Sequence, residues 1–451
     1  MYLYEFSSYR IKGLKQHFFY NELIQIVKTA IIPSMGAEFY GDDYKVNTEA
    51  IFVGIPTFLK LPWARSNKEL RQIKPDVAVI GEPFDFGTTI RPGTRYGPRA
   101  IRAASTVPSP PYEHFNIETG VDPFEVFKVV DYGDVAISPG DVIESHMRMT
   151  KKVHEALDIG AIPIILGGDH SCTFANVRAL AKKYKKIGLI HIDCHADCAP
   201  DGLTGFKYDH GAHIRRIMDL GCLNGKNYTL IGPRGYWPGP DLYKYMYDKD
   251  FQWFTMLDVE ELGVEAITKE AIDRANEGVD AVHISWDIDS FDPAFAPGTG
   301  EPEPNGLTSR EGMRMMRMLS TAFDPDTFQF DLVEVSPTYD VSDVSSYNGG
   351  ITSMLANRLI IELLAGLSLT KKGRREGKPV RPKEYRGLGH TYNWGMPNGV
   401  SGKGDVHLHK DMQGRARIHS HRHGHHGHSH TKKELENFRN ERRHRTSKRL
   451  K

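Results

Sequence analysis

The feature that most constrains this 451-residue chain is an alternation of short apolar runs with amphipathic stretches, which begins at about residue 75. Parallel strands joined by crossover helices produce this pattern, because helices cover both faces of the sheet. Eight strands are predicted, at 77–83, 127–133, 162–168, 187–193, 227–233, 251–257, 281–287 and 330–336. Helices are predicted at 141–158, 171–184, 264–276, 309–322 and 351–367. Periodicity alone allows either an open sheet or a closed barrel.

Changes of composition outside this alternating region divide the chain into four parts. Residues 1–70 are predicted to be an N-terminal extension that packs on the core, and residues 71–370 to be the core domain. Residues 371–402 are a C-terminal extension. Residues 403–451 form a His-rich and basic tail, which we expect to be disordered because it has little apolar material to bury.

The charge balance and the apolar runs argue against several classes of partner. The 58 Lys and Arg residues nearly balance 57 Asp and Glu residues, so the net charge points neither to nucleic acid nor to an acidic membrane surface. No apolar run approaches the roughly 20 residues of a membrane span. The four cysteines are too few and too unevenly spaced for a disulfide framework, which favours a reducing compartment. We therefore expect a cytoplasmic protein, with an organelle of a eukaryotic cell as the alternative.

Three of the predicted strands end in acidic residues and histidines. In the motif HIDCHADC these residues alternate, and the strand period of two places them on one side. The carboxyl ends of parallel strands meet at one edge of a sheet, where α/β proteins bind ligands. The candidate ligands are His170 in GGDHS, Asp193, His195 and Asp197 in HIDCHADC, and Asp287 and Asp289 in SWDIDSFDP.

These six side chains predict a metal centre. Carboxylates clustered at a dry strand end repel one another and lose their hydration, so without cations they become protonated or are expelled. Two imidazoles among four carboxylates suit borderline divalent metals such as manganese, nickel, iron or zinc better than calcium or magnesium. With six candidate ligands, two ions about 3.5–4 Å apart are more natural than one. The alternative, that these residues only cap turns, explains each motif singly but not the three together.

The motifs resemble those of the ureohydrolases, the family of arginases, agmatinases, guanidinobutyrases and their relatives. The resemblance covers residues 77–366 and includes, in the family's order, PFDFGTTIRPGTRYGPRAIR, GGDHS, DCHADC, YDHG, SWDIDSFDPAFAPGTG, GLTSRE and EVSPTYD. It implies that residues 71–370 are a catalytic domain with a three-layer αβα fold around an eight-stranded, mainly parallel sheet. This selects the open sheet over the barrel.

The resemblance also implies roles for individual residues. One metal ion would be held by His170, Asp193, Asp197 and Asp287, and the other by Asp193, His195, Asp287 and Asp289. By the same matching, His210 in YDHG would shuttle a proton to the leaving nitrogen, and Glu334 in EVSP would grip the guanidinium NH groups. The alternatives without a catalytic role are that His210 is a solvent-exposed loop histidine and that Glu334 is a buried structural glutamate.

The substrate implied by the resemblance is a small guanidino compound. Arginases read the amino-acid end of arginine with an Asn and an Asp, but Ala199 and Gly235 stand at those positions, so arginine is not expected. Trp286, Tyr236 and Trp237 add bulk where a long substrate would need space, and Glu301 stands where many relatives have Thr. These features resemble the nickel-dependent guanidine hydrolase branch of the family, so we expect hydrolysis of guanidine to urea and ammonia, with agmatine or guanidinobutyrate as alternatives. The distant alternative is a non-catalytic metal-binding relative.

The expected cofactors are two divalent ions per subunit, Ni²⁺ or Mn²⁺, since the same ligands accept either metal. The family usually forms trimers or hexamers, so a homo-oligomer is expected. Seven histidines fall between His419 and His430, and as neutral imidazoles they would bind transition metals. This run predicts metal storage or delivery, with a nickel chaperone as a possible partner. The alternative is low-complexity sequence without function.

Overall fold

The computed structural model describes residues 54–106, 114–201, 205–236, 239–341 and 349–375, together with four short strands between residues 385 and 420. The first 53 residues, Trp237 and the His-rich run lie outside the described residues, apart from the backbone of residues 419 and 420 in the last short strand. The predicted division of the chain at residues 70, 370 and 402 therefore stays a prediction.

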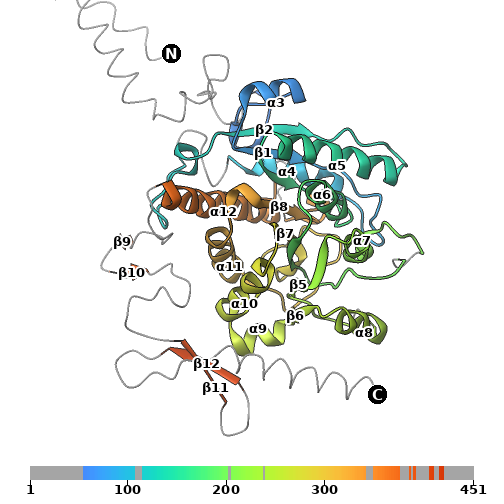
Figure 1. The fold of residues 1–451 in the computed structure, drawn as a ribbon, viewed down its shortest axis with the longest axis vertical. Coiled ribbons are helices and arrows are strands. Elements are labelled where there is room, and N and C mark those ends of the chain that lie inside the picture. Colours follow the sequence, from blue (N-terminus) through green and yellow to red (C-terminus); the bar gives the residue numbers. More distant parts are fainter. Residues whose placement is uncertain are drawn as a thin grey trace, which may run out of the picture.

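The predicted strands form one eight-stranded sheet (Figure 1), in the order β2-β1-β3-β8-β7-β4-β5-β6. Every neighbouring pair in this sheet is parallel. The strands are β1 (Val77–Gly81), β2 (Val129–Asp134), β3 (Ile162–Leu166), β4 (Ile187–Ile192), β5 (Leu223–Ile231), β6 (Gln252–Phe254), β7 (Ala281–Asp287) and β8 (Phe328–Val333). The open parallel sheet is confirmed.

Helices cover both faces of this sheet, so the fold has three layers (Figure 1). One face packs against α4 (Gly97–Ala104), α9 (Met256–Leu262), α10 (Val264–Asn276), α11 (Ser309–Ala322) and α12 (Ile351–Arg375). The other face packs against α3 (Asn67–Ile73), α5 (Val142–Asp158), α6 (Cys172–Ala181), α7 (His213–Asp219) and α8 (Pro240–Asp248). Successive strand residues alternate between the two cores, as the strand period of two requires: Val77 and Val79 face one, and Ala78 and Ile80 the other.

Several elements differ from their predicted extents, and two of these differences are informative. The strand predicted at 251–257 ends at Phe254, because Thr255 and Asp258 form a reciprocal capping box that begins α9. Helix α12 continues to Arg375 instead of ending at 367. Its segment Ile351–Arg374 is long and apolar enough to cross a membrane, yet 78% of its most apolar window is buried inside the protein. It is a core helix that packs against the sheet and α11.

The residues before β1 cover the outer edge of the sheet. Trp63 pairs with Asp131 of the edge strand β2, and the Ala64 N–H donates to the Asp131 carbonyl oxygen at 2.9 Å. The Phe58 N–H donates to the Asp131 carboxylate at 2.8 Å, and the Arg102 guanidinium pairs with the same carboxylate. This segment therefore satisfies backbone groups that an open strand edge would expose.

The sheet order determines where the candidate ligands meet. Strands β3, β8, β7 and β4 are consecutive in the sheet although they are distant in sequence. His170 follows β3, Glu334 follows β8, Asp287 ends β7 and Asp193 follows β4. Because the strands are parallel, these four residues lie at the same edge.

Candidate metal centre and substrate cavity

Three carboxylate oxygens surround one nitrogen of His170. Its Nδ1 lies 2.9 Å from Oδ2 of Asp193, 2.9 Å from Oδ2 of Asp287 and 3.4 Å from Oδ2 of Asp197. A single N–H group cannot satisfy three acceptors at once. These atoms therefore form a set of electron-pair donors that converge on one point, as the ligands of a metal ion do.

A second imidazole faces the other side of the same aspartate. Nδ1 of His195 lies 3.2 Å from Oδ2 of Asp289 and 3.6 Å from Oδ1 of Asp193. Asp193 thus turns Oδ2 toward His170 and Oδ1 toward His195, as a carboxylate shared by two ions does. All six predicted ligands lie together, and this donor set of oxygen and imidazole nitrogen fits two borderline divalent ions.

The electrostatics of the cluster also fit bound cations. Burial, reinforced by Asp289 and Asp193, raises the pKa of Asp287 well above its usual range. Burial and the Asp193 charge likewise raise the pKa of Asp197. Burial works in the same direction on Asp193, but the imidazoles of His191 and His170 outweigh it and hold the Asp193 pKa well below its usual range. Carboxyls that would otherwise retain protons become ionised when divalent cations compensate their charge.

Two site residues have backbone conformations that L-residues rarely adopt. Asp197 has φ 42° and Glu334 has φ 63°. Such conformations cost on the order of 1–3 kcal/mol each and persist only where the surroundings impose them. Here the Asp197 carbonyl oxygen accepts the N–H of Ile214 at 3.0 Å, and Oε1 of Glu334 accepts the N–H of His170 at 2.9 Å. These backbone conformations orient the carboxylates of Asp197 and Glu334 toward the metal-ligand candidates.

His210 lies between two glutamates beside the metal ligands. Its Nδ1 donates to Oε1 of Glu334 at 2.9 Å, and its Nε2 lies 3.3 Å from Oε1 of Glu301. Nε2 also lies 2.8 Å from Oγ1 of Thr89. Burial opposes charging of this imidazole, but the hydrogen bonds with Glu301 and Glu334 raise the His210 pKa well above its usual range. In the neutral ring Nε2 accepts the Thr89 N–H at 3.2 Å, and in the protonated ring it can donate to Glu301 on the cavity wall.

The cluster opens into a cavity of about 410 Å³. Its described lining includes six carboxylate residues but no Lys or Arg, so it favours a cationic ligand. The lining residues are Thr89, Ile90, His195, Asp197, His210, Gly211, Asp287, Asp289, Gly300, Glu301, Pro302, Glu303 and Glu334.

The aromatic side chains that were predicted to narrow the substrate pocket do not lie in its described lining. Trp286 is fully buried, stacks on Phe291 and donates from Nε1 to Ser290, so the prediction that it narrows the pocket was wrong. Asp287 points to the site, and the preceding residue of a strand faces the opposite way. Tyr236 is fully exposed and is not part of the cavity lining, so that prediction was also wrong. Trp237 lies outside the described residues, whereas Glu301 lines the cavity.

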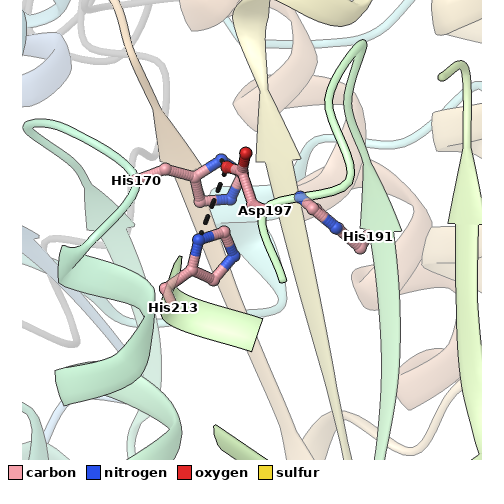
Figure 2. Close-up of side chains that lie close together, drawn as sticks. All are labelled: His170, His191, Asp197 and His213. Carbon is pink, nitrogen blue, oxygen red and sulfur yellow. Dashed lines mark ion pairs between the residues drawn. The ribbon is translucent and has the colours of Figure 1, made fainter. Parts of the chain in front are cut away.

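The structure adds two histidines that the sequence analysis did not select (Figure 2). His191 donates from Nε2 to Oδ2 of Asp193 at 2.7 Å, and its Nδ1 lies 2.9 Å from the hydroxyl of Tyr228. His213 stacks on His170, with 4.0 Å between ring centroids, and its Nδ1 lies 3.5 Å from Oδ2 of Asp197. The signal for His191 was present, because it stands two residues before Asp193 in the same strand.

His213 also connects the cluster to His210. Its Nδ1 donates to the His210 carbonyl oxygen at 3.0 Å, while its Nε2 is buried without a hydrogen-bond partner among the described residues. Burial and the neighbouring imidazoles His170 and His191 hold the His213 pKa well below its usual range. This neutral ring thus joins the backbone of His210 to the side chain of Asp197.

Comparisons with known proteins agree with this geometry. The model of the arginase family matches residues 75–366. A guanidinobutyrase from Pseudomonas aeruginosa is 37% identical over 326 residues, which cover 70% of this chain and 93% of that protein. A mitochondrial agmatinase from Gallus gallus is 37% identical over 316 residues, which cover 70% of this chain and 86% of that protein.

A solved structure is similar as well. The proclavaminate amidino hydrolase of Streptomyces clavuligerus superposes with a TM-score of 0.60 and 32% sequence identity, covering 71% of this chain and all of its own. The family match spans the whole sheet, and the cluster of histidines and aspartates lies at the sheet edge where the strands end. The chain therefore belongs to the arginase family and is a ureohydrolase that acts on guanidino compounds.

Proposed function

We propose that this enzyme releases urea from a guanidino compound that carries a side chain, as agmatine and guanidinobutyrate do. The observation that carries the proposal is the acidic cavity of about 410 Å³ beside the metal-ligand cluster. Its volume far exceeds that of a bare guanidinium ion, and neither Trp286 nor Tyr236 reduces it. The relatives named guanidinobutyrase and agmatinase support the same substrate class.

The reaction breaks a C–N bond of the guanidinium group and forms a C–O bond with water. The six ligands would hold divalent ions, which when bound would supply a strong nucleophile near neutral pH by lowering the pKa of water from 15.7 to about 7. The carboxylate of Glu334 holds the guanidinium NH groups through charge-assisted hydrogen bonds. His210 carries a proton on Nε2 to the leaving nitrogen, so that urea and a protonated amine are the products.

Free guanidine is the second candidate, and Glu301 favours it. The carboxylates of Glu301 and Glu334 lie on opposite ring nitrogens of His210, at 3.3 and 2.9 Å. Together the two carboxylates offer hydrogen-bond acceptors to an unsubstituted guanidinium ion from two directions. Guanidine would yield urea and ammonia by the same steps.

We further propose Ni²⁺ or Mn²⁺ as the cofactor, a homo-oligomer of three or six subunits, and a cytoplasmic location. Imidazole and carboxylate ligands accept both metals. All four cysteines are free and buried, which suits a reducing compartment. A nickel chaperone is the proposed partner for metal loading.

The experiment is a substrate panel on the full chain. The purified protein is loaded with Mn²⁺ or Ni²⁺ and assayed for urea with guanidine, agmatine, 4-guanidinobutyrate, 3-guanidinopropionate and arginine. We expect the highest kcat/KM with a compound that carries a side chain but is not arginine. If guanidine gives the highest kcat/KM, the second candidate is correct, and if no compound yields urea with either metal, the proposed function is wrong.

A further inference from the structure

One wall of the cavity is the segment Gly300–Glu303, which follows β7 and the turn after it. At one end, a Cβ added at Gly300 would lie 3.7 Å from Oε2 of Glu334. At the other end, Cδ of Glu303 lies 2.9 Å from the position that a Cβ on residue 235 would take. The segment therefore runs along the cavity from the carboxylate proposed to hold the guanidinium to the loop that follows β5.

The position of Glu303 depends on the glycine in that loop. Gly235 has φ 74°, a conformation that L side chains rarely adopt, and a Cβ there would lie 2.9 Å from Cδ of Glu303, so the Glu303 side chain would have to move. The close approach of the loop leaves Glu303 on the cavity wall, half-buried.

The carboxylate of Glu303 is not neutralised by its surroundings. Among the described residues, no side chain forms an ion pair or a hydrogen bond with it, and no Lys or Arg lines the cavity. Arg234 is close in sequence, but its Nη2 donates to the main-chain oxygens of Glu303 and Asp289, at 2.6 and 2.8 Å. The guanidinium of Arg234 is thus engaged with the backbone, and the negative charge of Glu303 remains available to a ligand.

From these contacts we infer that Glu303 is a specificity-determining residue, which selects a guanidino compound whose far end carries a second positive charge, such as a primary amine. The inference rests on the proposed function. A carboxylate at the far end of an acidic cavity attracts an ammonium group and repels a substrate carboxylate. Glu303 therefore favours amine-ended compounds over guanidino acids and over compounds with an uncharged end.

Two substrates with the same alkyl chain isolate the effect of a positive charge at the far end of the substrate. Agmatine ends in an ammonium group, and 1-butylguanidine has the same four carbons without it. We expect the metal-loaded enzyme to prefer agmatine, and Glu303→Gln to lower kcat/KM for agmatine about three- to fivefold, the change expected when one partly exposed charge pair is removed. The value for 1-butylguanidine should change less than about twofold, because no charge is lost opposite it.

Controls separate a local effect from a general one. Glu261→Gln removes the same charge from an exposed position of α9 and should leave both substrates unaffected. Glu303→Lys should invert the preference toward 4-guanidinobutyrate. The preference of the wild-type enzyme for agmatine should also shrink as salt concentration increases, since salt screens partly exposed charges.

The outcomes distinguish the inference from the proposed function. Equal kcat/KM for agmatine and 1-butylguanidine in the wild-type enzyme, or equal losses on both substrates in Glu303→Gln, overturns the role of Glu303. Hydrolysis of guanidine alone also overturns it, while leaving the family activity intact. If no guanidino compound is hydrolysed by the metal-loaded protein, the proposed function itself fails.

Discussion

Nδ1 of His170 lies 2.9 Å from Oδ2 of Asp287, although the strands that precede or carry them, β3 and β7, are separated by β8. The contact exists because the side chains reach across the end of the intervening strand. A metal ion at this point would therefore be bound from several strands at once, and it would link them.

Removal of a shared carboxylate should remove metal. In Asp193→Ala or Asp287→Ala we expect the loss of at least one ion per subunit and of nearly all activity, because each residue faces more than one other ligand. Metal content after desalting measures the result, with Asp248→Ala on the surface of α8 as the control. Two tightly bound ions in either variant would show that the ligands are assigned wrongly.

Replacement of Glu334, the carboxylate proposed to hold the guanidinium, should impair substrate binding but not metal content. Glu334→Gln keeps the size of the side chain but loses its charge, so kcat/KM should fall roughly 10- to 100-fold, as expected for a charged hydrogen bond of about 1.5–3 kcal/mol. Metal analysis and steady-state kinetics on the same preparation test this. Unchanged kinetics would place the guanidinium elsewhere.

The pH dependence should report the environment of His210. Burial opposes its charging, whereas the hydrogen bonds with Glu301 and Glu334 raise its pKa, so the protonated form persists to higher pH than in a free imidazole. If His210 donates a proton, activity falls as pH rises through this pKa. Glu301→Gln removes one charge that raises the pKa, and the alkaline limb of the kcat profile should move to lower pH. A limb that does not move, or moves upward, would contradict this role.

His213 is expected to act as a positioning residue. Its Nδ1–H approaches Asp197 and the His210 carbonyl oxygen, while its ring stacks on His170. His213→Phe retains a stacking ring but removes the donor, so metal affinity should weaken about 10- to 100-fold, as for other groups that orient ligands. Competition with a chelator measures the affinity. If this variant keeps the metal affinity and activity of the wild type, His213 contributes only to packing.

The His-rich tail should influence metal acquisition only. A chain truncated after residue 402 is expected to keep full turnover when metal is in excess, and to load poorly when nickel or manganese is scarce, because the imidazoles that collect metal are gone. Activity is compared after loading at limiting and at saturating metal. Full loading under scarcity would leave the tail without this role, and lost turnover at saturation would make it part of the active site.

The sequence predicted the sheet well because buried parallel strands are short, continuous apolar runs, and few other elements have this pattern. It predicted the convergence of the six metal-ligand candidates for the same reason, since each ends such a run or follows it within about five residues. Short helices such as α7 and α8 were not predicted, because fewer than three turns give weak periodicity. Trp286 does not line the cavity because successive side chains of a strand alternate, so that Asp287 faces the site and Trp286 faces the core.

Other parts of the site depend on contacts that no local pattern encodes. Glu301 lies near His210 only because the turn after β7 folds back over the strand ends. The volume of the cavity, the stacking of His213 on His170 and the approach of Glu303 to Gly235 likewise require the packed structure. The left-handed backbone at Asp197 and Glu334 is also invisible in sequence, because neither residue type favours it strongly enough to be recognised.

The place of β8 has a consequence for synthesis of the protein. This strand is the last of the eight in the chain, yet it lies between β3 and β7 and is the only strand that joins β2-β1-β3 to β7-β4-β5-β6. During translation both halves of the sheet emerge before the strand that unites them, and their pairing spans a long stretch of sequence, which slows folding. The six metal-ligand candidates follow or end β3, β4 and β7, which lie on both sides of β8, so the complete cluster is held in place only once β8 has paired with its neighbours. We therefore expect metal loading to follow closure of the sheet, so that the ions bind to a subunit in which β8 is already paired.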